Sequence, residues 1–189
     1  MVSASQDGGG LRPAVFLDRD GVLVIPEFRA GRSFAPRRLE DFQLYAQAQP
    51  SLLRLKSAGY LLVVVTNQPD IGHGVVGADT VRDMHRILRR RLPIDLVKMC
   101  PHTRQHQCAC RKPKPTLILE AAEELAISLP LSFMVGDRSS DVEAGQAAGC
   151  GTVLIDLGYD EAITVSPDFV VHNVAEAVDV ILRAKGNSM

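Results

Sequence analysis

FLDRDGV, residues 16–22, is the stretch of sequence that decides the fold. It continues the short apolar run Ala14–Leu17, which is typical of a buried strand, and Gly21 then breaks that strand. Side chains two residues apart in an extended segment point to the same side, so Asp18 and Asp20 are expected to face one crevice beyond the strand end. Like charges this close are unfavourable unless a cation or a proton intervenes. The pair therefore indicates a Mg²⁺ site with a reactive carboxylate, whereas the simpler alternative is a strand that ends in a turn.

The composition is that of a globular protein with one domain. The chain has 189 residues, of which 46% are hydrophobic and 23% charged, enough for one substantial core. A net charge of −1 gives no strong field that would attract nucleic acid or anionic lipid, and no apolar stretch approaches the ~18 residues that cross a bilayer. Residues 1–13 are expected to form a disordered tail without the pattern of a signal peptide, and residues 14–189 a single domain. We also expect a cytoplasmic monomer with no nucleic-acid or membrane partner.

Short apolar runs alternate with amphipathic helical patterns along the rest of the chain. After the first strand, further strands are expected at Leu61–Val65, Ile94–Met99, Phe133–Val135, Gly151–Ile155 and Phe169–Val171. Helices are expected at Gln49–Ala58, around Val81–Leu88, around Ile118–Leu125 with Thr116 as cap, from Ser139 as cap to Gly149, and at Val174–Ala184. This alternation predicts an α/β fold, a Rossmann-like three-layer sandwich with a mostly parallel central sheet. No glycine-rich dinucleotide or P-loop fingerprint follows the first strand.

Four polar segments lie at or just past expected strand ends. They are Asp18–Asp20, Thr66–Gln68, Arg111–Pro113 and Gly136–Asp141. Each alone is common in turns or solvated loops, but their order, each beyond an apolar run, is specific. Together they suit phosphoryl transfer, because one carboxylate can attack phosphorus, a second can protonate the leaving oxygen, and a hydroxyl and a lysine can bind the phosphoryl oxygens. A further acid would complete a Mg²⁺ site that screens the negative charges.

This ordered set resembles the four motifs of the haloacid dehalogenase superfamily of phosphohydrolases. The resemblance implies that Asp18 is the nucleophile and Asp20 the general acid and base, and that Thr66 and Lys112 stabilise the phosphoryl group. It implies further that Mg²⁺ is bound by Asp18, the backbone carbonyl of Asp20, and Asp137. The stretches between the first three motifs are too short for a large inserted cap domain, so an open site bordered by short loops is expected.

Three of the four cysteines are close together, within residues 100–110 and with the spacing C-x-H-x5-C-x-C. Three thiolates and one imidazole would make a closed, structural Zn²⁺ site, and this polar segment has little apolar content that could otherwise order it. The ligands would be Cys100, His102, Cys108 and Cys110. His106 is an alternative to His102, and chance clustering of reduced cysteines is the alternative to a metal site. Metal binding rather than disulfides agrees with a reducing compartment.

The combined pattern, C-P-H followed by C-x-C-R-K-P-K-P, resembles the heptose 1,7-bisphosphate phosphatases and the related histidinol phosphatases, over about Val15–Tyr159. It implies removal of one phosphate from D-glycero-D-manno-heptose 1,7-bisphosphate through an aspartyl-phosphate, on the way to nucleotide-activated heptose. The alternative substrate is histidinol phosphate or another small phosphosugar. By this resemblance Arg111 and Arg138 would bind the substrate, and Asn67 and Gln68 would line its pocket.

Some segments are not explained by this resemblance. The turn Pro69–Gly74 carries Asp70, a negative charge where a phosphate would approach. Segment 26–42 contains four arginines and is either a specificity loop or a solvated basic loop. Asp141 matches the last acid of the fourth motif. His85 lies on an apolar helix stripe, where a packed or half-exposed histidine is expected rather than a ligand.

Two other classes of protein fit less well. A phosphorylated signalling receiver also uses Asp, Thr and Lys around Mg²⁺, but it needs an isolated Asp at the end of the third strand, where this chain has its cysteine segment. A zinc-ribbon nucleic-acid module needs two C-x-x-C knuckles and a basic surface, and the sequence has neither.

Overall fold

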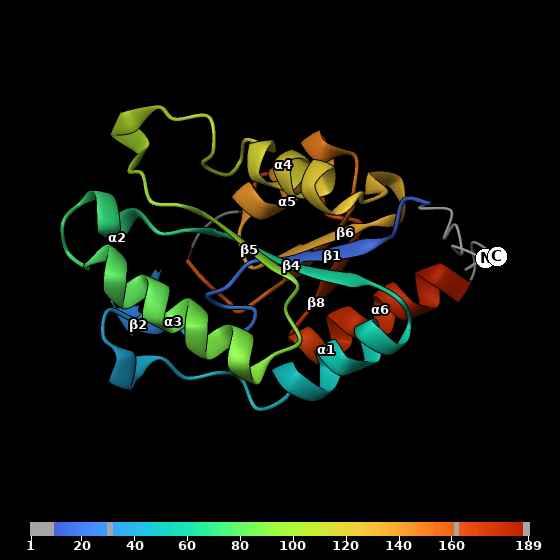
Figure 1. Cartoon of the computed structure of the whole chain (residues 1–189), viewed down its shortest axis with the longest axis horizontal. Helices are drawn as coiled ribbons and strands as arrows, with labels where there is room; N and C mark the ends of the chain where they lie inside the picture. The colour runs from blue at the N-terminus through green and yellow to red at the C-terminus, as the bar shows by residue number, and fades with distance from the viewer. Residues whose placement is uncertain (1–9, 30–31, 161–162, 187–189) are drawn as a thin grey trace, which may run out of the picture.

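A six-stranded parallel sheet organises the described part of the chain, which comprises residues 10–29, 32–160 and 163–186 of the computed structural model (Figure 1). The strands lie in the order β5-β4-β1-β6-β7-β8, and every neighbouring pair is parallel. In chain order they are β1 (Ala14–Leu17), β4 (Leu61–Asn67), β5 (Leu96–Cys100), β6 (Phe133–Gly136), β7 (Gly151–Ile155) and β8 (Phe169–Val171). The predicted α/β fold with a mostly parallel central sheet is confirmed.

Helices cover both faces of this sheet, which makes three layers (Figure 1). One face is covered by α1 (Ala48–Ser57), α3 (Ala78–Arg91) and α6 (Val174–Gly186), and the other by α4 (Thr116–Leu125) and α5 (Ser139–Ala148). Alternate residues of β1 enter two separate cores: Val15 and Leu17 pack with the first group of helices, Ala14 and Phe16 with the second. A strand buried on both faces needs apolar residues throughout, which is why this strand has no polar alternation.

The two predicted hydroxyl caps are wrong by one residue. Thr116 is the first residue of α4 rather than its cap, and its hydroxyl donates to the Ala109 carbonyl oxygen at 2.9 Å. Ser139 is likewise the first residue of α5, and its hydroxyl oxygen accepts from the backbone N–H of Thr164. At α5 a residue of the first helical turn makes a capping hydrogen bond: the Asp141 carboxylate accepts the backbone N–H of Arg138.

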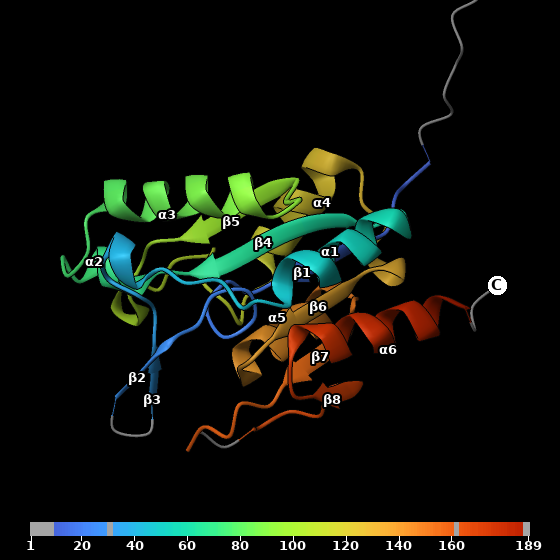
Figure 2. The same cartoon turned by 90° about the horizontal axis from the view of Figure 1, so that it is seen from below.

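A short hairpin is the main element that the sequence patterns did not predict. It consists of β2 (Glu27–Arg29) and β3 (Arg32–Phe34), which pair antiparallel and stand away from the sheet (Figure 2). The other additions are the single turn α2 (Pro69–Gly72) and the 3-10 turns η1 (Leu39–Asp41), η2 (Arg104–His106) and η3 (Leu129–Leu131). Each of these strands has three residues with a single apolar side chain, Phe28 or Phe34, so neither shows an apolar run or a two-residue period.

The amino-terminal end of the described chain is tied to the sheet. Most of the tail predicted over residues 1–13 lies in residues 1–9, outside the described residues. Closer to β1, the Arg12 N–H donates to the Ala126 carbonyl oxygen, and the Pro13 carbonyl oxygen accepts from Leu61. Among the helices of the described residues, none combines the length and the apolar character needed to cross a membrane.

Candidate active site

Polar side chains meet at the carboxyl ends of β4, β1 and β6, three adjacent strands of the sheet. Asp18 directly follows β1, Thr66 lies near the end of β4, and Asp137 directly follows β6. Carboxylate oxygens of Asp18, Asp137 and Asp141 all lie within 4.8 Å of one another, and all three residues are buried. They meet because β1 pairs with β4 on one side and with β6 on the other. The crevice expected from the sequence therefore contains carboxylates from two strand ends and one helix.

Lys112 joins these acids from the segment that follows the cysteines. Its ammonium nitrogen lies 3.0 Å from Asp18 Oδ1 and 2.6 Å from Asp141 Oδ1, and it donates to the Val65 carbonyl oxygen at 2.6 Å. Burial acts to lower the pKa of Lys112, but the charges of Asp141 and Asp18 outweigh burial and raise the pKa above its ordinary value. Lys112 is therefore a fixed cation between two carboxylates.

The acid cluster carries more negative charge than Lys112 neutralises. Asp137 Oδ1 is buried and has no hydrogen-bond partner among the described residues. Burial, then the charges of Asp18 and Asp141, raise the pKa of Asp137 well above its ordinary value. Burial also raises the pKa of Asp141 to about 6, although Lys112 opposes this shift. Buried oxygens that repel one another fit Mg²⁺, a cation that prefers oxygen ligands.

Two glycines let the backbone approach the acid cluster closely. Gly21 has a φ of +87°, which a side chain disfavours, and a Cβ there would overlap the Asp137 carboxylate. A Cβ at Gly136 would overlap the side chain of Asp141. The glycine that breaks the first strand therefore also makes room for the acid of another strand.

Asp20 lies in a hydrogen-bond network beside the acid cluster. The fully buried Arg19 donates from Nε to both Asp20 oxygens at 3.1 Å and from Nη2 to Oδ2 at 2.9 Å. Gln68 donates from Nε2 to the same Oδ2 at 2.8 Å and to Thr66 Oγ1 at 2.9 Å. Gln68 borders the cavity as expected, but its buried amide is already committed to Asp20 and Thr66.

Asn67 connects the end of β4 to the segment that carries Lys112. Its amide donates to the Lys112 carbonyl oxygen at 3.2 Å, and its own oxygen accepts the Lys112 N–H at 3.2 Å. Both residues border the cavity. This two-way contact fixes the backbone of Lys112 relative to the sheet.

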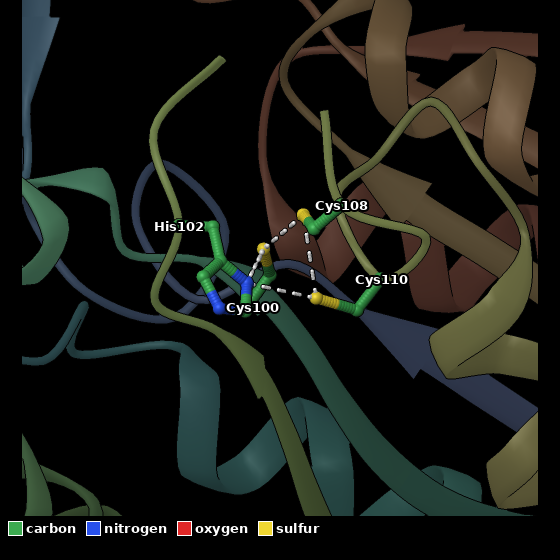
Figure 3. Close-up of side chains that lie close together, drawn as sticks. All are labelled: Cys100, His102, Cys108 and Cys110. Atoms are coloured by element: carbon green, nitrogen blue, oxygen red, sulfur yellow. Dashed lines mark hydrogen bonds between the residues drawn. The ribbon is translucent and has the colours of Figure 1, made fainter. Parts of the chain in front are cut away.

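The cysteine segment forms a compact four-sided cluster after β5 (Figure 3). Neighbouring atoms are separated by 3.7 Å (Cys100 Sγ to His102 Nδ1), 3.3 Å (His102 Nδ1 to Cys110 Sγ), 3.5 Å (Cys110 Sγ to Cys108 Sγ) and 3.6 Å (Cys108 Sγ to Cys100 Sγ). A tetrahedral Zn²⁺ with bonds of about 2.0–2.3 Å needs ligand separations of about 3.5–3.8 Å. All four cysteines of the chain are free thiols, and burial raises the pKa of Cys110 to about 12, so a cation is needed there to keep a thiolate. The donor set and its spacing fit Zn²⁺.

His106, the alternative ligand, lies outside this cluster. Its Nδ1 accepts hydrogen bonds from the N–H and the hydroxyl of Thr103, which caps η2. Around the cluster, Arg111 donates to the His102 carbonyl oxygen at 3.2 Å and Lys114 to the Cys108 carbonyl oxygen at 2.7 Å. These two cations offset the negative charge that three thiolates would bring.

A cavity of about 680 Å³ opens between the acid cluster and the cysteine segment. Asp18, Asp20 and Asp141 border it on the sheet side. Its basic lining residues are Arg104, Arg111, Lys112, Lys114 and Arg138. Lys112 and Arg138 lie beside the acids, whereas Arg104, Arg111 and Lys114 come from the cysteine segment and its continuation. Cations therefore border the cavity on both sides of the carboxylates, an arrangement that suits a small, multiply anionic ligand.

Segment 26–42 borders this cavity as well. Arg138 donates to the carbonyl oxygen of Ser33 at 3.0 Å and to its hydroxyl at 2.7 Å, so the hairpin is held against the fourth motif. Arg37 pairs with Asp70 at 2.8 Å. The negative charge of Asp70 in the unexplained turn is therefore neutralised within the chain.

Three residues of the site were not found from the sequence. Tyr159, beyond β7, donates from its hydroxyl to Asp137 Oδ2 at 2.6 Å. In the sequence Arg19 is typical of a turn, but in the structure it is buried against Asp20. His85 has the pattern of an ordinary helix residue, but it contacts Arg19. None of the three has a local pattern that distinguishes it, because each acts through a partner distant in sequence or through an unusual degree of burial.

The sequence and the fold match known proteins. The family model described as HAD-hydrolase-like matches residues 109–177. The D-glycero-beta-D-manno-heptose-1,7-bisphosphate 7-phosphatase of Pasteurella multocida is 36% identical over 189 residues, which cover 93% of this chain and 100% of that protein. The D-glycero-alpha-D-manno-heptose-1,7-bisphosphate 7-phosphatase of Mycobacterium bovis is 36% identical over 155 residues, 75% of this chain and 78% of that protein.

Among solved structures, the D,D-heptose 1,7-bisphosphate phosphatase of B. bronchiseptica, complexed with magnesium and phosphate, superposes with a TM-score of 0.76. The two chains are 24% identical, and the match covers 91% of this chain and 99% of that one. This likeness establishes the fold. The two relatives above, with their higher identity over most of their length, establish the family.

Proposed function

This chain belongs to the heptose-1,7-bisphosphate 7-phosphatase family of haloacid dehalogenase-like hydrolases, and on that premise we propose that it removes the 7-phosphate of D-glycero-D-manno-heptose 1,7-bisphosphate. The observation that carries the proposal is the cavity that brings the reactive carboxylates together with several cations. For a substrate with two phosphates, the site must react with one phosphate and only bind the other. The product would serve the synthesis of nucleotide-activated heptose.

Asp18 is the proposed nucleophile. Its carboxylate attacks phosphorus, the bond from phosphorus to the sugar oxygen breaks, and an aspartyl-phosphate forms. Asp20 gives a proton to the leaving sugar oxygen, then takes one from the water that hydrolyses the aspartyl-phosphate, so Asp18 is regenerated and inorganic phosphate leaves. Lys112, already 3.0 Å from Asp18, and the Thr66 hydroxyl hold the phosphoryl oxygens as charge spreads over them.

Asp18, the backbone carbonyl of Asp20, and Asp137 are the proposed ligands of Mg²⁺, with Asp141 beside them. When bound, Mg²⁺ screens the repulsion between the carboxylates and the phosphate and orients the phosphoryl group. Tyr159 and Gly21 keep Asp137 in place for this role, one by a hydrogen bond and the other by leaving room.

Two of the cations that border the cavity are proposed to bind the second phosphate and the sugar hydroxyls. Arg111 and Arg138 supply the charge. Asn67 and Gln68 line the same pocket, where Asn67 holds the backbone of Lys112 and Gln68 holds Asp20 and Thr66. Structural Zn²⁺ on Cys100, His102, Cys108 and Cys110 would hold the segment that carries Arg111 and Lys112. Bound Zn²⁺ would then shape the site without contacting the substrate.

We further propose that residues 14–189 work as one domain and as a monomer in the cytoplasm, without a nucleic-acid or membrane partner. The six-stranded sheet has a core on each face, and the net charge of the chain is only −1. The free thiols suit a reducing compartment.

Phosphate release tests the proposed substrate. The purified protein with Mg²⁺ is assayed in parallel on the α and β anomers of the heptose 1,7-bisphosphate, on histidinol phosphate and on fructose 1,6-bisphosphate. We expect kcat/KM for one heptose anomer to exceed that for histidinol phosphate and for fructose 1,6-bisphosphate by about 100-fold or more. The expected product is the heptose 1-phosphate. A preference for histidinol phosphate, or release of the 1-phosphate, would contradict it.

A further inference from the structure

His85 contacts the catalytic network through a buried arginine. It lies on α3, between the buried residues Met84 and Leu88, and its Nε2 is 3.2 Å from Nη1 of Arg19. An arginine guanidinium carries only donors, so Nε2 must be the acceptor and the ring must be neutral with its proton on Nδ1. The other edge of the same guanidinium holds Asp20 through Nε and Nη2.

Arg19 has little freedom outside these contacts. Its side chain is fully buried, Nη2 also donates to Gln68 Oε1 at 2.9 Å, and the Phe42 ring lies 5.6 Å from its guanidinium carbon. A buried cation is tolerated only while its N–H groups have acceptors. Without the acceptor on α3, Nη1 would be a buried donor lacking this partner, and the guanidinium that also binds Asp20 would be less firmly held.

The geometry leaves one Asp20 oxygen for proton transfer. Oδ2 accepts from both Arg19 Nη2 and Gln68 Nε2, whereas Oδ1 accepts only the longer bond from Arg19 Nε. A proton given to a leaving oxygen would therefore come from Oδ1, and the direction of Oδ1 is set by the angle of the guanidinium.

We propose that His85 is a positioning residue for Asp20: it holds Arg19 from the side of α3, and Arg19 in turn aims Asp20 Oδ1 at the leaving oxygen of the substrate. This inference rests on the proposed role of Asp20 as general acid. Burial and the charge of Arg19 lower the pKa of His85 to about 4, so the ring stays a neutral acceptor at the pH of the cell.

Leaving-group dependence distinguishes this role from a merely structural one. A sugar alkoxide needs a proton to leave, whereas p-nitrophenolate is stable enough to leave without one. For His85→Leu, kcat/KM, which reports the steps up to departure of the leaving group, is expected to fall about 10- to 100-fold with the heptose bisphosphate but little with p-nitrophenyl phosphate. His85→Gln places an amide oxygen near the position of Nε2 and is expected to restore most of the loss.

Two control variants keep the test decisive. Val81→Ala truncates a buried residue one turn earlier on α3, and it is expected to lower thermal stability while leaving the ratio of the two kcat/KM values unchanged. Asp20→Asn removes the acid itself and is expected to change that ratio most. If Asp20→Asn leaves the ratio unchanged, the proposed role of Asp20 fails. If Asp20→Asn changes it while His85→Leu lowers both rates equally or neither, only the inference about His85 is overturned.

Discussion

The two walls of the cavity are ordered by different means. On the sheet side, Asp18 and Asp137 directly follow strands whose apolar residues are almost fully buried, so packing holds the charges even while they repel one another. On the other side, segment 101–111 contains no buried apolar residue. Only its half-buried Cys108 and Cys110 pack against a core, and both belong to the group of metal-type ligands. A packed sheet can hold like charges close together, whereas a polar loop has few packing contacts of its own, which is the reason for proposing a metal ion there.

The largest expected effect comes from the sheet wall. Asp18→Asn is expected to lower kcat by about 10³-fold or more, because an amide cannot form the aspartyl-phosphate. Thermal stability should change little, since the substitution removes one of three carboxylates that repel one another, although Lys112 loses a partner. Asp179→Asn, on the exposed face of α6, is the matched control and should keep full activity. Activity of Asp18→Asn within tenfold of wild type would be incompatible with covalent catalysis.

The cysteine wall should respond differently to loss of a ligand. Cys110→Ser is expected to abolish zinc binding, expose the Arg104 bond to trypsin, and reduce kcat/KM by about 10- to 100-fold because Lys112 is less well placed. The same change at the buried Cys150, outside the cluster, should keep both zinc content and protease resistance. Metal analysis and limited proteolysis measure the two effects. Full zinc occupancy in Cys110→Ser would show that this ligand set is wrong.

Arg111 separates binding from chemistry. Arg111→Ala is expected to raise KM by about tenfold while kcat falls much less, because a cation that binds the non-reacting phosphate stabilises the ground state and the transition state alike. Arg91→Ala, at the exposed end of α3, serves as control and should leave both constants unchanged. Steady-state kinetics measures both constants. A large fall in kcat with KM unchanged would assign Arg111 to the chemical step instead.

The smallest expected effect is a dependence of stability on pH in the metal-free protein. The pKa of Asp141 is about 6 in the folded chain against an ordinary value of 3.8, so between these values the folded state holds a proton that the unfolded state has released. Stability contributed by this group is therefore present at low pH and is lost as pH rises from about 4 to about 6.

Mg²⁺ should reverse this trend, because it binds the deprotonated acids. We expect Mg²⁺ to raise the melting temperature by a few degrees at pH 7.5 and by less at pH 5. Asp141→Asn should weaken the pH dependence without Mg²⁺. A Mg²⁺-induced shift that is equal at the two pH values would contradict the assignment of these acids to the metal site.

The sheet wall could be predicted from the sequence in more detail than its surroundings. Continuous apolar runs indicated β1, β4 and β6, and the polar residues that follow them were expected at one edge of a parallel sheet. The structure adds the order of the strands, which makes the ends of these three neighbours. The cysteine spacing likewise indicated which four side chains would cluster. The apolar runs with their polar ends and the cysteine spacing are both local patterns. In both, the residue types limit the metals and reactions that fit.

What the sequence could not provide are contacts made between distant segments. The hairpin has strands of only three residues, and its contact to Arg138 depends on how the fold brings Ser33 to α5. Tyr159 reaches Asp137 from beyond β7, and a buried Arg19 contradicts the usual exposure of arginine. These residues are read from tertiary packing, because nothing in their neighbours along the chain distinguishes them.

Trapping the covalent intermediate tests the central claim most directly. The enzyme with Mg²⁺ and the heptose bisphosphate is quenched in acid within one turnover, reduced with borohydride and digested, and the peptide that contains residues 14–22 is sequenced by mass spectrometry. We expect a substrate-dependent conversion of Asp18 to homoserine, absent from Asp20 and from enzyme incubated without substrate. Phosphate release at the normal rate with Asp18 unmodified, or modification of a different residue, would contradict it.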